Sequence, residues 1–304
     1  MKKYLVLVVI AIGVLALFLW PAGESVEVET FYLPHDDGTY AYCEAVFPKH
    51  VGEWHMPLVA MGHGFTGTLN SGGAEELAHR LAEAGIATVR VDFDPRVEAD
   101  KKAEKTNMYS LSSMEADLAA AIDYMCEHYT INEAAIGLYA RSMGGRVAMM
   151  MANENYGGYD YACMYLVAPA GTKDAMIYYM GGQEKWDEMK TSAAALGYVE
   201  KQGQKLTPQW FAEFEEYDPC AHGWENFGNK PVEVLYNTDD YVVTSSTSIQ
   251  CAAAYAHSLT IEVTTDDGHG YEMGYKESEL KEEIMEGIVK FFKNNLEKNL
   301  EKNI

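Results

Sequence analysis

Ser142 stands where its hydroxyl group could act as a nucleophile. It lies in ARSMG, residues 140–144, a variant of the motif G-x-S-x-G with alanine at the first small position. The preceding run EAAIGLYA is typical of a buried strand, and the following run GGRVAMMMANE is typical of a helix. A strand that turns directly into a helix exposes a serine at the helix N-terminus, whose dipole favours developing negative charge. We therefore expect Ser142 to be a catalytic nucleophile.

A serine hydroxyl needs a base and an orienting carboxylate before it can attack. Among the nine histidines, His269 is the expected base, because it lies between two glycines in DDGHGYEM, directly after the last predicted strand. Asp240 in NTDDYVV also follows a strand and is the expected acid, with Asp239 as its main rival. Asp266 and Asp267 are nearer to the histidine in sequence, but so short a separation rarely gives the required side-chain geometry.

Two backbone N–H groups are needed to stabilise a tetrahedral oxyanion. We expect one from Met143, the residue after the serine. We expect the other from Phe65 in GHGFTG, residues 62–67, where glycines let the backbone approach a substrate. His63 in the same loop is expected to brace the loop rather than act as a base.

These segments require a sheet whose loops meet at one edge. SVEVETFYL and TYAYCEAVF flank the turn residues Asp37 and Gly38 and predict an antiparallel hairpin. Strand-like and helix-like runs then alternate, with a capping-box spacing from Ser112 to Glu115 and a closing amphipathic helix, ESELKEEIMEGIVKFFKNNLEKNL. The pattern predicts an α/β fold with a mostly parallel central sheet, an antiparallel leading hairpin and helices on both faces.

One long segment, residues 171–222, interrupts this alternation between two predicted strands. It is far longer than an ordinary connection and is rich in aromatic residues and methionine. We expect a helical lid insertion that covers the substrate. Tyr178 and Trp186 in this segment, together with Arg141 beside the serine, are the expected substrate contacts.

The composition of the 304-residue chain limits its partners. It has 46 acidic and 23 basic residues, and the resulting formal charge of −23 disfavours binding to nucleic acid. The five cysteines have no zinc-type spacing, and VDFDP is only a weak candidate for a cation site, so we expect no metal and no cofactor. One disulfide is possible outside the cell, but neither the cysteine pair nor the oligomeric state follows from the sequence.

Residues 1–23 form a separate N-terminal segment. Two lysines precede an uncharged, mostly apolar run from Tyr4 to Trp20, which is long enough to cross most of a bilayer. Trp20 and Pro21 stand where a cleavage site needs small residues, so a membrane anchor is favoured over a cleaved signal peptide. We expect residues 24–304 to form one extracytoplasmic domain, either anchored to the membrane or secreted.

Taken together, the segments resemble the α/β-hydrolase superfamily. HGFTG, ARSMGG, NTDDYVV and DGHGY stand in that family's order, within a stretch from about Val26 to the C-terminal helix. HGFTG and the insertion after the sixth strand are most similar to the cinnamoyl and feruloyl esterase branch, in which the acid stands where this chain has Asp240. Relatives usually have Gly-His before the serine and D-x-x-G-H-G-x-S after the fourth strand, whereas this chain has Ala140-Arg141 and DFDPRVEADKKAEK.

The resemblance implies a serine hydrolase that cleaves a small-molecule carboxylic ester. The acyl-enzyme would form on Ser142, with His269 as the base and Asp240 as the orienting acid. Arg141 would place a cation near the site and favour an acidic substrate. Two alternatives stay open: a serine peptidase of the same fold, and a surface-displayed binding module that has lost catalysis.

Overall fold

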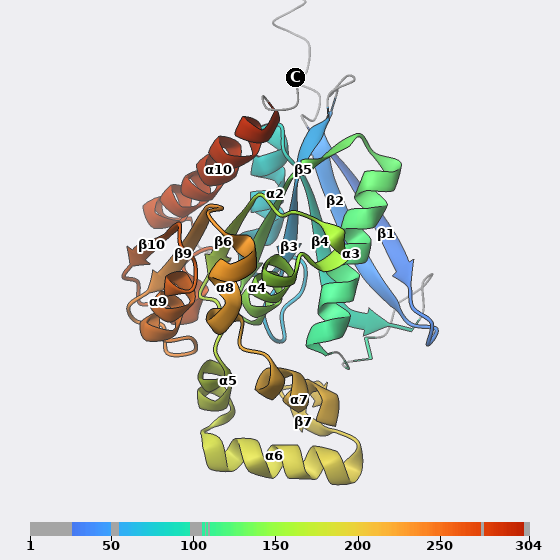
Figure 1. Ribbon diagram of the computed structural model, residues 1–304, viewed down its shortest axis with the longest axis vertical. Helices are drawn as coiled ribbons and strands as arrows, with labels where there is room; N and C mark the ends of the chain where they lie inside the picture. The colour runs from blue at the N-terminus through green and yellow to red at the C-terminus, as the bar shows by residue number, and fades with distance from the viewer. Residues whose placement is uncertain are drawn as a thin grey trace, which may run out of the picture.

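The computed structural model describes residues 26–49, 55–97, 105–106, 108, 110–274 and 277–300. Within these residues, eight strands form one central sheet: β1 (Val26–Pro34), β2 (Tyr40–Pro48), β3 (Met56–Gly62), β4 (Ala87–Arg96), β5 (Ile131–Arg141), β6 (Cys163–Val167), β9 (Val232–Asn237) and β10 (Ser258–Val263). Their order is β1-β2-β4-β3-β5-β6-β9-β10 (Figure 1). β2 pairs antiparallel with β1 and β4, and the other neighbours are parallel. The predicted sheet and leading hairpin are therefore confirmed.

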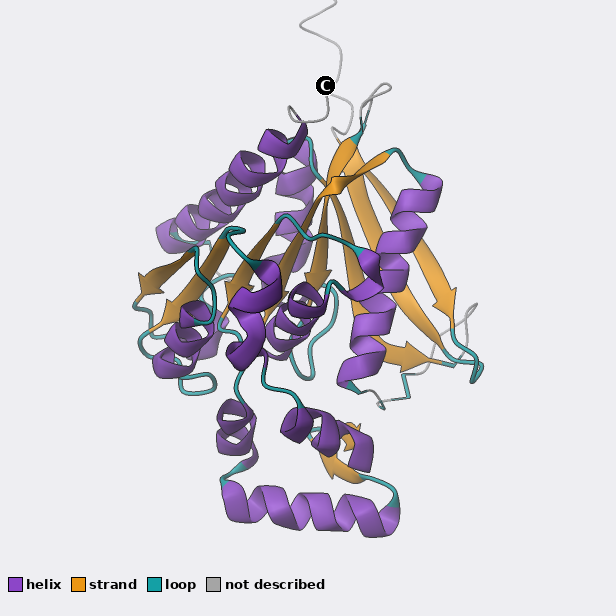
Figure 2. Ribbon diagram, in the orientation of Figure 1, coloured by secondary structure: helices purple, strands orange, loops and turns teal. Residues whose placement is uncertain are grey.

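Helices cover both faces of this sheet (Figure 2). One face carries α2 (Ala74–Glu83) and α10 (Glu279–Leu300), and the other carries α3 (Leu111–His128), α4 (Met143–Glu154), α8 (Pro219–Phe227) and α9 (Ser245–Ala253). Successive strand residues point to opposite faces. In β3, Leu58 and Ala60 join the apolar cluster under α3 and α4, whereas Val59 and Met61 join the one under α2 and α10. Burial on both faces explains why the central strands are nearly continuous apolar runs.

The N-cap of α3 is two residues earlier than the sequence predicted, at Ser110 instead of Ser112. Ser110 is the N-cap: its hydroxyl accepts a hydrogen bond from the Ser113 N–H at 3.1 Å, and the Ser113 hydroxyl accepts one from the Ser110 N–H at 2.9 Å. The prediction of a capping box from Ser112 to Glu115 is therefore wrong. Glu115 lies inside the helix and is buried, so it does not reach back to the helix start.

The chain between β6 and β9 forms a largely helical insertion, residues 171–222. Besides the start of α8, it holds α5 (Lys173–Met180), α6 (Gln183–Leu196), α7 (Pro208–Glu216) and a hairpin of β7 (Val199–Lys201) and β8 (Gln204–Leu206). Figure 1 shows α5, α6 and α7 beyond the carboxyl ends of the parallel strands. The hairpin was not predicted; Gln202 and Gly203 form its turn with positive φ of 51° and 80°. That the insertion acts as a lid stays a prediction.

A buried arginine ties both ends of the insertion to the sheet domain. Arg146 of α4 donates through Nη1 to the Gly171 carbonyl at 2.7 Å, and through Nη2 to the carbonyls of Phe214 and Tyr217. Its guanidinium carbon also lies 4.5 Å from the centre of the Phe214 ring. Burial lowers the pKa of Arg146 to about 10, so the side chain stays charged at neutral pH and depends on these carbonyls to replace water.

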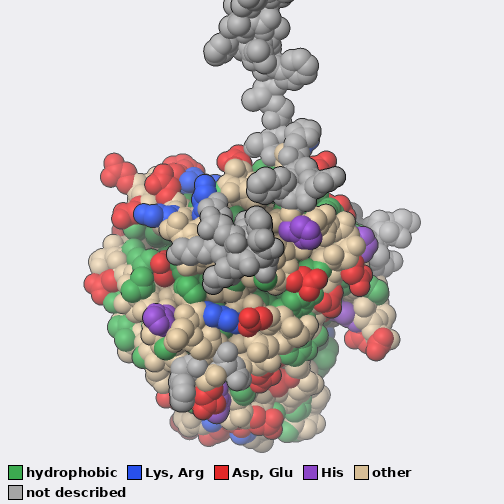
Figure 3. Space-filling model, turned by 45° about the horizontal axis from the view of Figure 1, so that its top comes forward, with side chains coloured by type: hydrophobic (Ala, Val, Ile, Leu, Met, Phe, Trp, Pro, Cys, Tyr) green, Lys and Arg blue, Asp and Glu red, His purple; other side chains and the backbone are tan. Residues whose placement is uncertain are grey.

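The surface reflects the acidic composition. Asp and Glu side chains are spread over the face in Figure 3, and the Lys and Arg side chains on that face are scattered. Such a distribution repels polyanions. In the part of the chain that the structure describes, no helix is both apolar and long enough to span a bilayer. The predicted N-terminal anchor or signal peptide, residues 1–23, lies outside the described residues, so it and the extracytoplasmic location stay predictions.

Candidate active site

The chain turns sharply at Ser142, between β5 and α4. The backbone there has φ of 54° and ψ of −121°, a conformation that residues other than glycine rarely adopt and that is typical of strained functional turns. The Ser142 N–H donates to the Val167 carbonyl at 2.9 Å, and the Ser142 carbonyl accepts from the N–H groups of Gly145 and Ala170, each at 2.9 Å. These bonds fix the serine between β5 and the chain that leaves β6.

Small residues let the predicted oxyanion loop approach this turn closely. A Cβ atom at Gly144 would lie 2.4 Å from the His63 carbonyl oxygen, and one at Gly64 would lie 2.9 Å from the Ser142 Cβ. Both distances are too short for a real side chain. The requirement for small residues two positions from the serine and in the GHGFTG loop therefore has a direct steric cause.

His269 and Asp240 meet at the same edge of the sheet as the serine. Asp240 lies in the turn after β9, and His269 lies in a short 3-10 helix after β10. His269 Nδ1 is 2.7 Å from Asp240 Oδ2, while Asp240 Oδ1 accepts from the N–H groups of Val242 and Val243 at 2.8 and 2.9 Å. Burial alone would raise the pKa of Asp240, but His269 and these N–H groups lower it below its ordinary value. The carboxylate thus stays ionised beside the imidazole.

Two residues without a predicted catalytic role hold this pair in place. The Tyr271 hydroxyl donates to Asp240 Oδ2 at 3.1 Å and accepts from the Asn237 N–H at 2.9 Å. The Asn237 side-chain amide donates to the carbonyls of Thr265 and Gly268 at 2.9 and 2.8 Å. These bonds connect the end of β9 to the loop that carries His269. In the sequence, only their positions near the expected catalytic residues could have indicated this role: Tyr271 follows His269 by two residues, and Asn237 precedes Asp240 by three.

Only one of the four candidate carboxylates contacts His269 within hydrogen-bond distance among the described residues. Asp240 is buried and makes this contact, whereas the rival Asp239 is exposed to solvent. Asp266 and Asp267 line the pocket in front of the histidine, and Asp267 accepts from the backbone N–H of Glu272 at 2.8 Å. The geometry therefore favours Asp240 as the partner of the imidazole.

Ser142 and His269 together line two pockets that meet at Phe65 and Thr66. The first is an open pocket of about 560 Å³, and the second is a smaller pocket of about 170 Å³. The charged and polar side chains that line the first include Ser71, Arg141, Asp266, Asp267 and Glu272. The walls of the second are mainly apolar and include Ala170, Ala175, Met176, Tyr179, Val242 and Val243. A molecule bound across Ser142 would thus place one part beside charged side chains and another among apolar ones.

The two expected oxyanion donors both belong to segments that meet at the serine. Met143 is the first residue of α4, where backbone N–H groups have no partner within the helix. Phe65 lines both pockets, and its ring packs 5.9 Å from the Tyr179 ring and 6.3 Å from the Trp210 ring of the insertion. The role of their N–H groups in stabilising an oxyanion stays a prediction.

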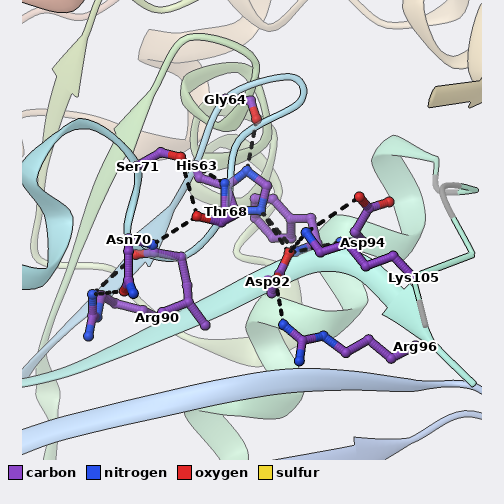
Figure 4. Close-up of polar contacts among 12 residues, drawn as sticks. His63, Gly64, Thr68, Asn70, Ser71, Arg90, Asp92, Asp94, Arg96 and Lys105 are labelled. Carbon is purple, nitrogen blue, oxygen red and sulfur yellow. Dashed lines mark hydrogen bonds and ion pairs between the residues drawn. The ribbon is translucent and has the colours of Figure 1, made fainter. Parts of the chain in front are cut away.

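His63 braces its loop, as expected. One ring nitrogen, Nδ1, lies 2.8 Å from the Gly64 carbonyl oxygen, and the other, Nε2, accepts from the Phe93 N–H at 3.0 Å (Figure 4). The side chain is buried, and its ring packs 4.8 Å from the Phe93 ring. Because both nitrogens have partners in the protein, His63 is not placed to serve as the base.

The aspartates of VDFDP are paired with cationic side chains. Asp92 accepts from Arg96 at 2.8 Å and from Lys105 at 3.1 Å, and Asp94 lies 3.5 Å from Lys105 (Figure 4). Burial would raise the pKa of Asp92, but His63 and these cations lower it, so the carboxylate stays charged. No group of three or more His, Cys, Asp or Glu residues in the described chain could hold a metal ion. Asp92 and Asp94 therefore belong to a cluster of ion pairs with Arg96 and Lys105.

Two of the three expected substrate contacts lie away from both pockets. Trp186 of α6 is fully buried, and its Nε1 donates to Glu215 at 3.0 Å within the insertion. Tyr178 of α5 is 59% exposed, and its neighbour Tyr179 lines the apolar pocket instead. The helix phase of α5 and the insertion's own core determine where its aromatic rings lie, and contact of Tyr178 or Trp186 with substrate stays a prediction. Arg141 does line the polar pocket.

Solved structures show which fold this architecture represents. Est1E from Butyrivibrio proteoclasticus has a TM-score of 0.66 and 19% identity, over 88% of this chain and 98% of its own. The hypothetical protein PA2218 from Pseudomonas aeruginosa has a TM-score of 0.69 and 14% identity, over 91% and 96%. Acetyl xylan esterase from Paenibacillus sp. R4 has a TM-score of 0.61 and 17% identity, over 90% and 86%. These similarities confirm the α/β-hydrolase fold.

A family model also matches the sequence itself. No curated protein matches this chain. The model described as serine aminopeptidase, S33, matches residues 55–222, which is more than half of the chain and includes Ser142. The protein therefore belongs to the serine aminopeptidase S33 family of α/β-hydrolases.

Proposed function

We propose that this protein cleaves a carboxylic ester through an acyl-enzyme formed on Ser142. His269 takes the proton of the Ser142 hydroxyl as the serine attacks the carbonyl carbon, and then passes it to the leaving alcohol. Asp240 holds the imidazole in the required orientation. The observation that carries the proposal is the 2.7 Å contact between His269 and the buried Asp240, at pockets that Ser142 also lines.

The second half of the reaction uses the same groups. His269 removes a proton from a water molecule, which attacks the acyl carbon and releases the acid from Ser142. In both halves, the negative charge on the tetrahedral oxygen would be stabilised by the N–H groups of Phe65 and Met143. No cofactor takes part in these steps.

The two pockets support a substrate with one apolar part and one polar part. The apolar pocket of about 170 Å³ is close in size to a cavity of about 150 Å³ that binds benzene in another protein, so we propose an aryl or short alkyl group there. A solved structure of Est1E from Butyrivibrio proteoclasticus contains ferulic acid, which has an aromatic ring, and this agrees with an aryl group.

The charges around the polar pocket argue against an acidic substrate. Asp266, Asp267 and Glu272 line it, and the formal charge of the whole chain is −23. Arg141, the one Lys or Arg among the described residues of its wall, donates to the His269 carbonyl. We therefore propose that the polar part of the substrate is neutral or cationic, in place of the acidic substrate that Arg141 suggested from sequence. We further propose that the enzyme acts outside the cytoplasm, anchored or exported by residues 1–23.

A second candidate function is aminopeptidase activity in the same site. The acidic wall formed by Asp266, Asp267 and Glu272 would attract the ammonium group of a peptide N-terminus. The description of the matching family names this activity. A surface-displayed binding module that has lost catalysis is the remaining alternative, and it predicts no turnover of either substrate type.

The test compares Ser142→Ala with the matched variant Ser192→Ala, whose serine lies on α6 in the insertion. We expect the wild type and Ser192→Ala to hydrolyse p-nitrophenyl benzoate, and Ser142→Ala to lose turnover by about 10⁶-fold while its circular dichroism spectrum is unchanged. An aminoacyl p-nitroanilide is assayed in parallel. Turnover of the anilide alone would favour the peptidase, and full ester turnover by Ser142→Ala would overturn both enzymatic assignments.

A further inference from the structure

Arg141 contacts the loop that carries the proposed base. It is the last residue of β5 and the neighbour of Ser142, and its Nη2 donates to the backbone carbonyl of His269. Its guanidinium carbon lies 5.3 Å from the centre of the Tyr271 ring, whose hydroxyl donates to Asp240. One side chain thus joins the serine's own strand to the backbone of His269 and to Tyr271, which holds Asp240.

The backbone opposite Arg141 is shaped to accept it. Gly72 has a positive φ of 64°, and a Cβ atom there would lie 2.5 Å from Arg141 Nη1 and 3.2 Å from its Cδ and Cζ. Any side chain at this position would displace the guanidinium. The glycine-rich turn of residues 71–73 therefore forms one wall of the space that holds Arg141.

A small cavity adjoins Arg141. It has a volume of about 20 Å³ and is lined by Tyr139, Arg141, His63 and Ser71 together with apolar residues. Tyr139 is only 3% exposed, and neither its hydroxyl nor Arg141 Nη1 has a hydrogen-bond partner among the described residues. Tyr139 and Arg141 are two positions apart on β5, so their side chains leave the strand on the same side.

The size and polarity of this cavity fit one water molecule. A buried water needs roughly 10–15 Å³ of such volume and two to four polar partners. The Tyr139 hydroxyl and Arg141 Nη1 provide two partners, and the Ser71 hydroxyl is a third polar group in the wall. Burial raises the pKa of Tyr139 to about 12, so its hydroxyl keeps its proton at neutral pH.

We propose that this cavity binds one water molecule that bridges the Tyr139 hydroxyl and Arg141 Nη1, and that Arg141 is a positioning residue for His269. The water and the His269 carbonyl hold the two ends of the guanidinium fork. A fixed guanidinium fixes the His269 backbone and so the approach of the imidazole to Ser142. The kinetic part of this inference rests on the proposed esterase function.

The kinetic test uses three variants. Arg141→Met keeps the length of the side chain without its donors, and we expect kcat to fall about 10²-fold with KM changed less than about twofold, because a base displaced by about 1 Å loses that much. Arg141→Lys keeps a charged donor and should recover about tenfold of the loss. Tyr139→Phe removes only the hydroxyl and should lower kcat about threefold. A rise in KM at constant kcat would make Arg141 a substrate contact and overturn the inference.

Two readouts do not depend on turnover. The proton shared between His269 Nδ1 and Asp240 gives a far-downfield proton resonance, which should be sharp in the wild type and broadened in Arg141→Met. A high-resolution crystal structure should show water between Tyr139 and Arg141, and an empty cavity or a guanidinium that does not contact the His269 carbonyl would contradict the proposal. If the wild type lacks turnover that depends on Ser142, the proposed function fails while these two readouts still decide the inference.

Discussion

The turn at Ser142 and the insertion both lie at the carboxyl ends of the parallel strands, but different forces hold them. Backbone hydrogen bonds to Val167, Gly145 and Ala170 hold the turn, and glycines let neighbouring loops approach it. The insertion instead depends on side chains. The buried Arg146 donates hydrogen bonds to both of its ends, and aromatic rings around Trp186 form its core. The first region is determined by local backbone geometry, and the second by contacts between residues distant in sequence.

The largest effect should come from breaking the contact between His269 and Asp240 beside the Ser142 turn. Asp240→Asn should lower kcat about 10⁴-fold, because an amide stabilises the wrong imidazole tautomer. The matched variant Asp239→Asn alters the exposed neighbouring carboxylate and should change kcat less than about twofold. Ester hydrolysis rates of both purified variants check this, and equal losses would contradict the assignment of Asp240.

For the insertion, the variant Arg146→Met removes the side chain that holds its two ends. It leaves the carbonyls of Gly171, Phe214 and Tyr217 without their buried donor, so we expect a loss of roughly 4 kcal/mol in stability. Hydrogen exchange should accelerate most in residues 171–222. Arg80→Met, which removes a partly exposed arginine from its ion pairs, should cost less than about 1 kcal/mol. Similar losses in the two variants would show that Arg146 does not hold the insertion.

Glu115 of α3, whose charged neighbours include Arg146 of α4 and Glu213 of the insertion, should make stability depend on pH. Burial raises the pKa of Glu115 to about 8, with Glu154 and Glu213 adding to the shift and Arg146 opposing it. An unfolded glutamate loses its proton near pH 4.3, so the folded state binds more protons between these values, and stability falls as pH rises. We expect a fall of roughly 3 kcal/mol from pH 5 to pH 8 in denaturant titrations. Glu115→Gln should reduce this slope, and an unchanged slope would contradict the role of Glu115.

A disulfide between Cys220 and Cys251 could stabilise the chain where the insertion ends. The Sγ atoms of Cys220 in α8 and Cys251 in α9 lie 3.4 Å apart, and both residues are free thiols in the structure. Oxidation by oxidised glutathione should join this pair and raise Tm by about 5 °C, because the cross-link restricts the unfolded chain. Cys220→Ser should abolish the increase. Peptide mapping that finds no bond between the two residues after oxidation would rule the pair out.

The smallest expected effect is a difference in KM between variants of two neighbouring tyrosines of α5, Tyr178 and Tyr179. Tyr179→Ala enlarges the apolar pocket and should raise KM for an aryl ester about tenfold, the equivalent of about 1.4 kcal/mol of lost contact. Tyr178→Ala alters an exposed ring and should leave KM within about twofold. The reverse ranking would restore the contact expected from the sequence.

The sequence was sufficient for the parts of the fold that local rules control. Alternating apolar runs predicted the sheet and its leading hairpin, and the spacing of small residues around Ser142 predicted a tight turn because bulk is excluded there. The loop positions of His269 and Asp240 followed from the rule that parallel strands end at one edge. That the two side chains are in contact required the structure, as did the supporting hydrogen bonds of Tyr271 and Asn237.

Side-chain placement in the insertion could not be read in this way. Nothing local distinguishes Tyr178 from Tyr179, since only the packing of α5 decides which ring faces the pocket. Trp186 was expected at the substrate because aromatic residues are frequent in binding sites, yet the insertion needs such rings for its own small core. Arg141 shows the same limit, because its partner, the His269 carbonyl, lies far away in the sequence.

Covalent labelling of Ser142 tests the central claim most directly. A fluorophosphonate reacts with a serine only where a base and oxyanion donors activate it. Mass spectrometry of the treated wild-type protein should find one adduct, on the peptide that contains Ser142, with none in Ser142→Ala and much slower labelling in His269→Ala. A folded wild type that stays unlabelled, or that carries the adduct on another residue, would contradict the account.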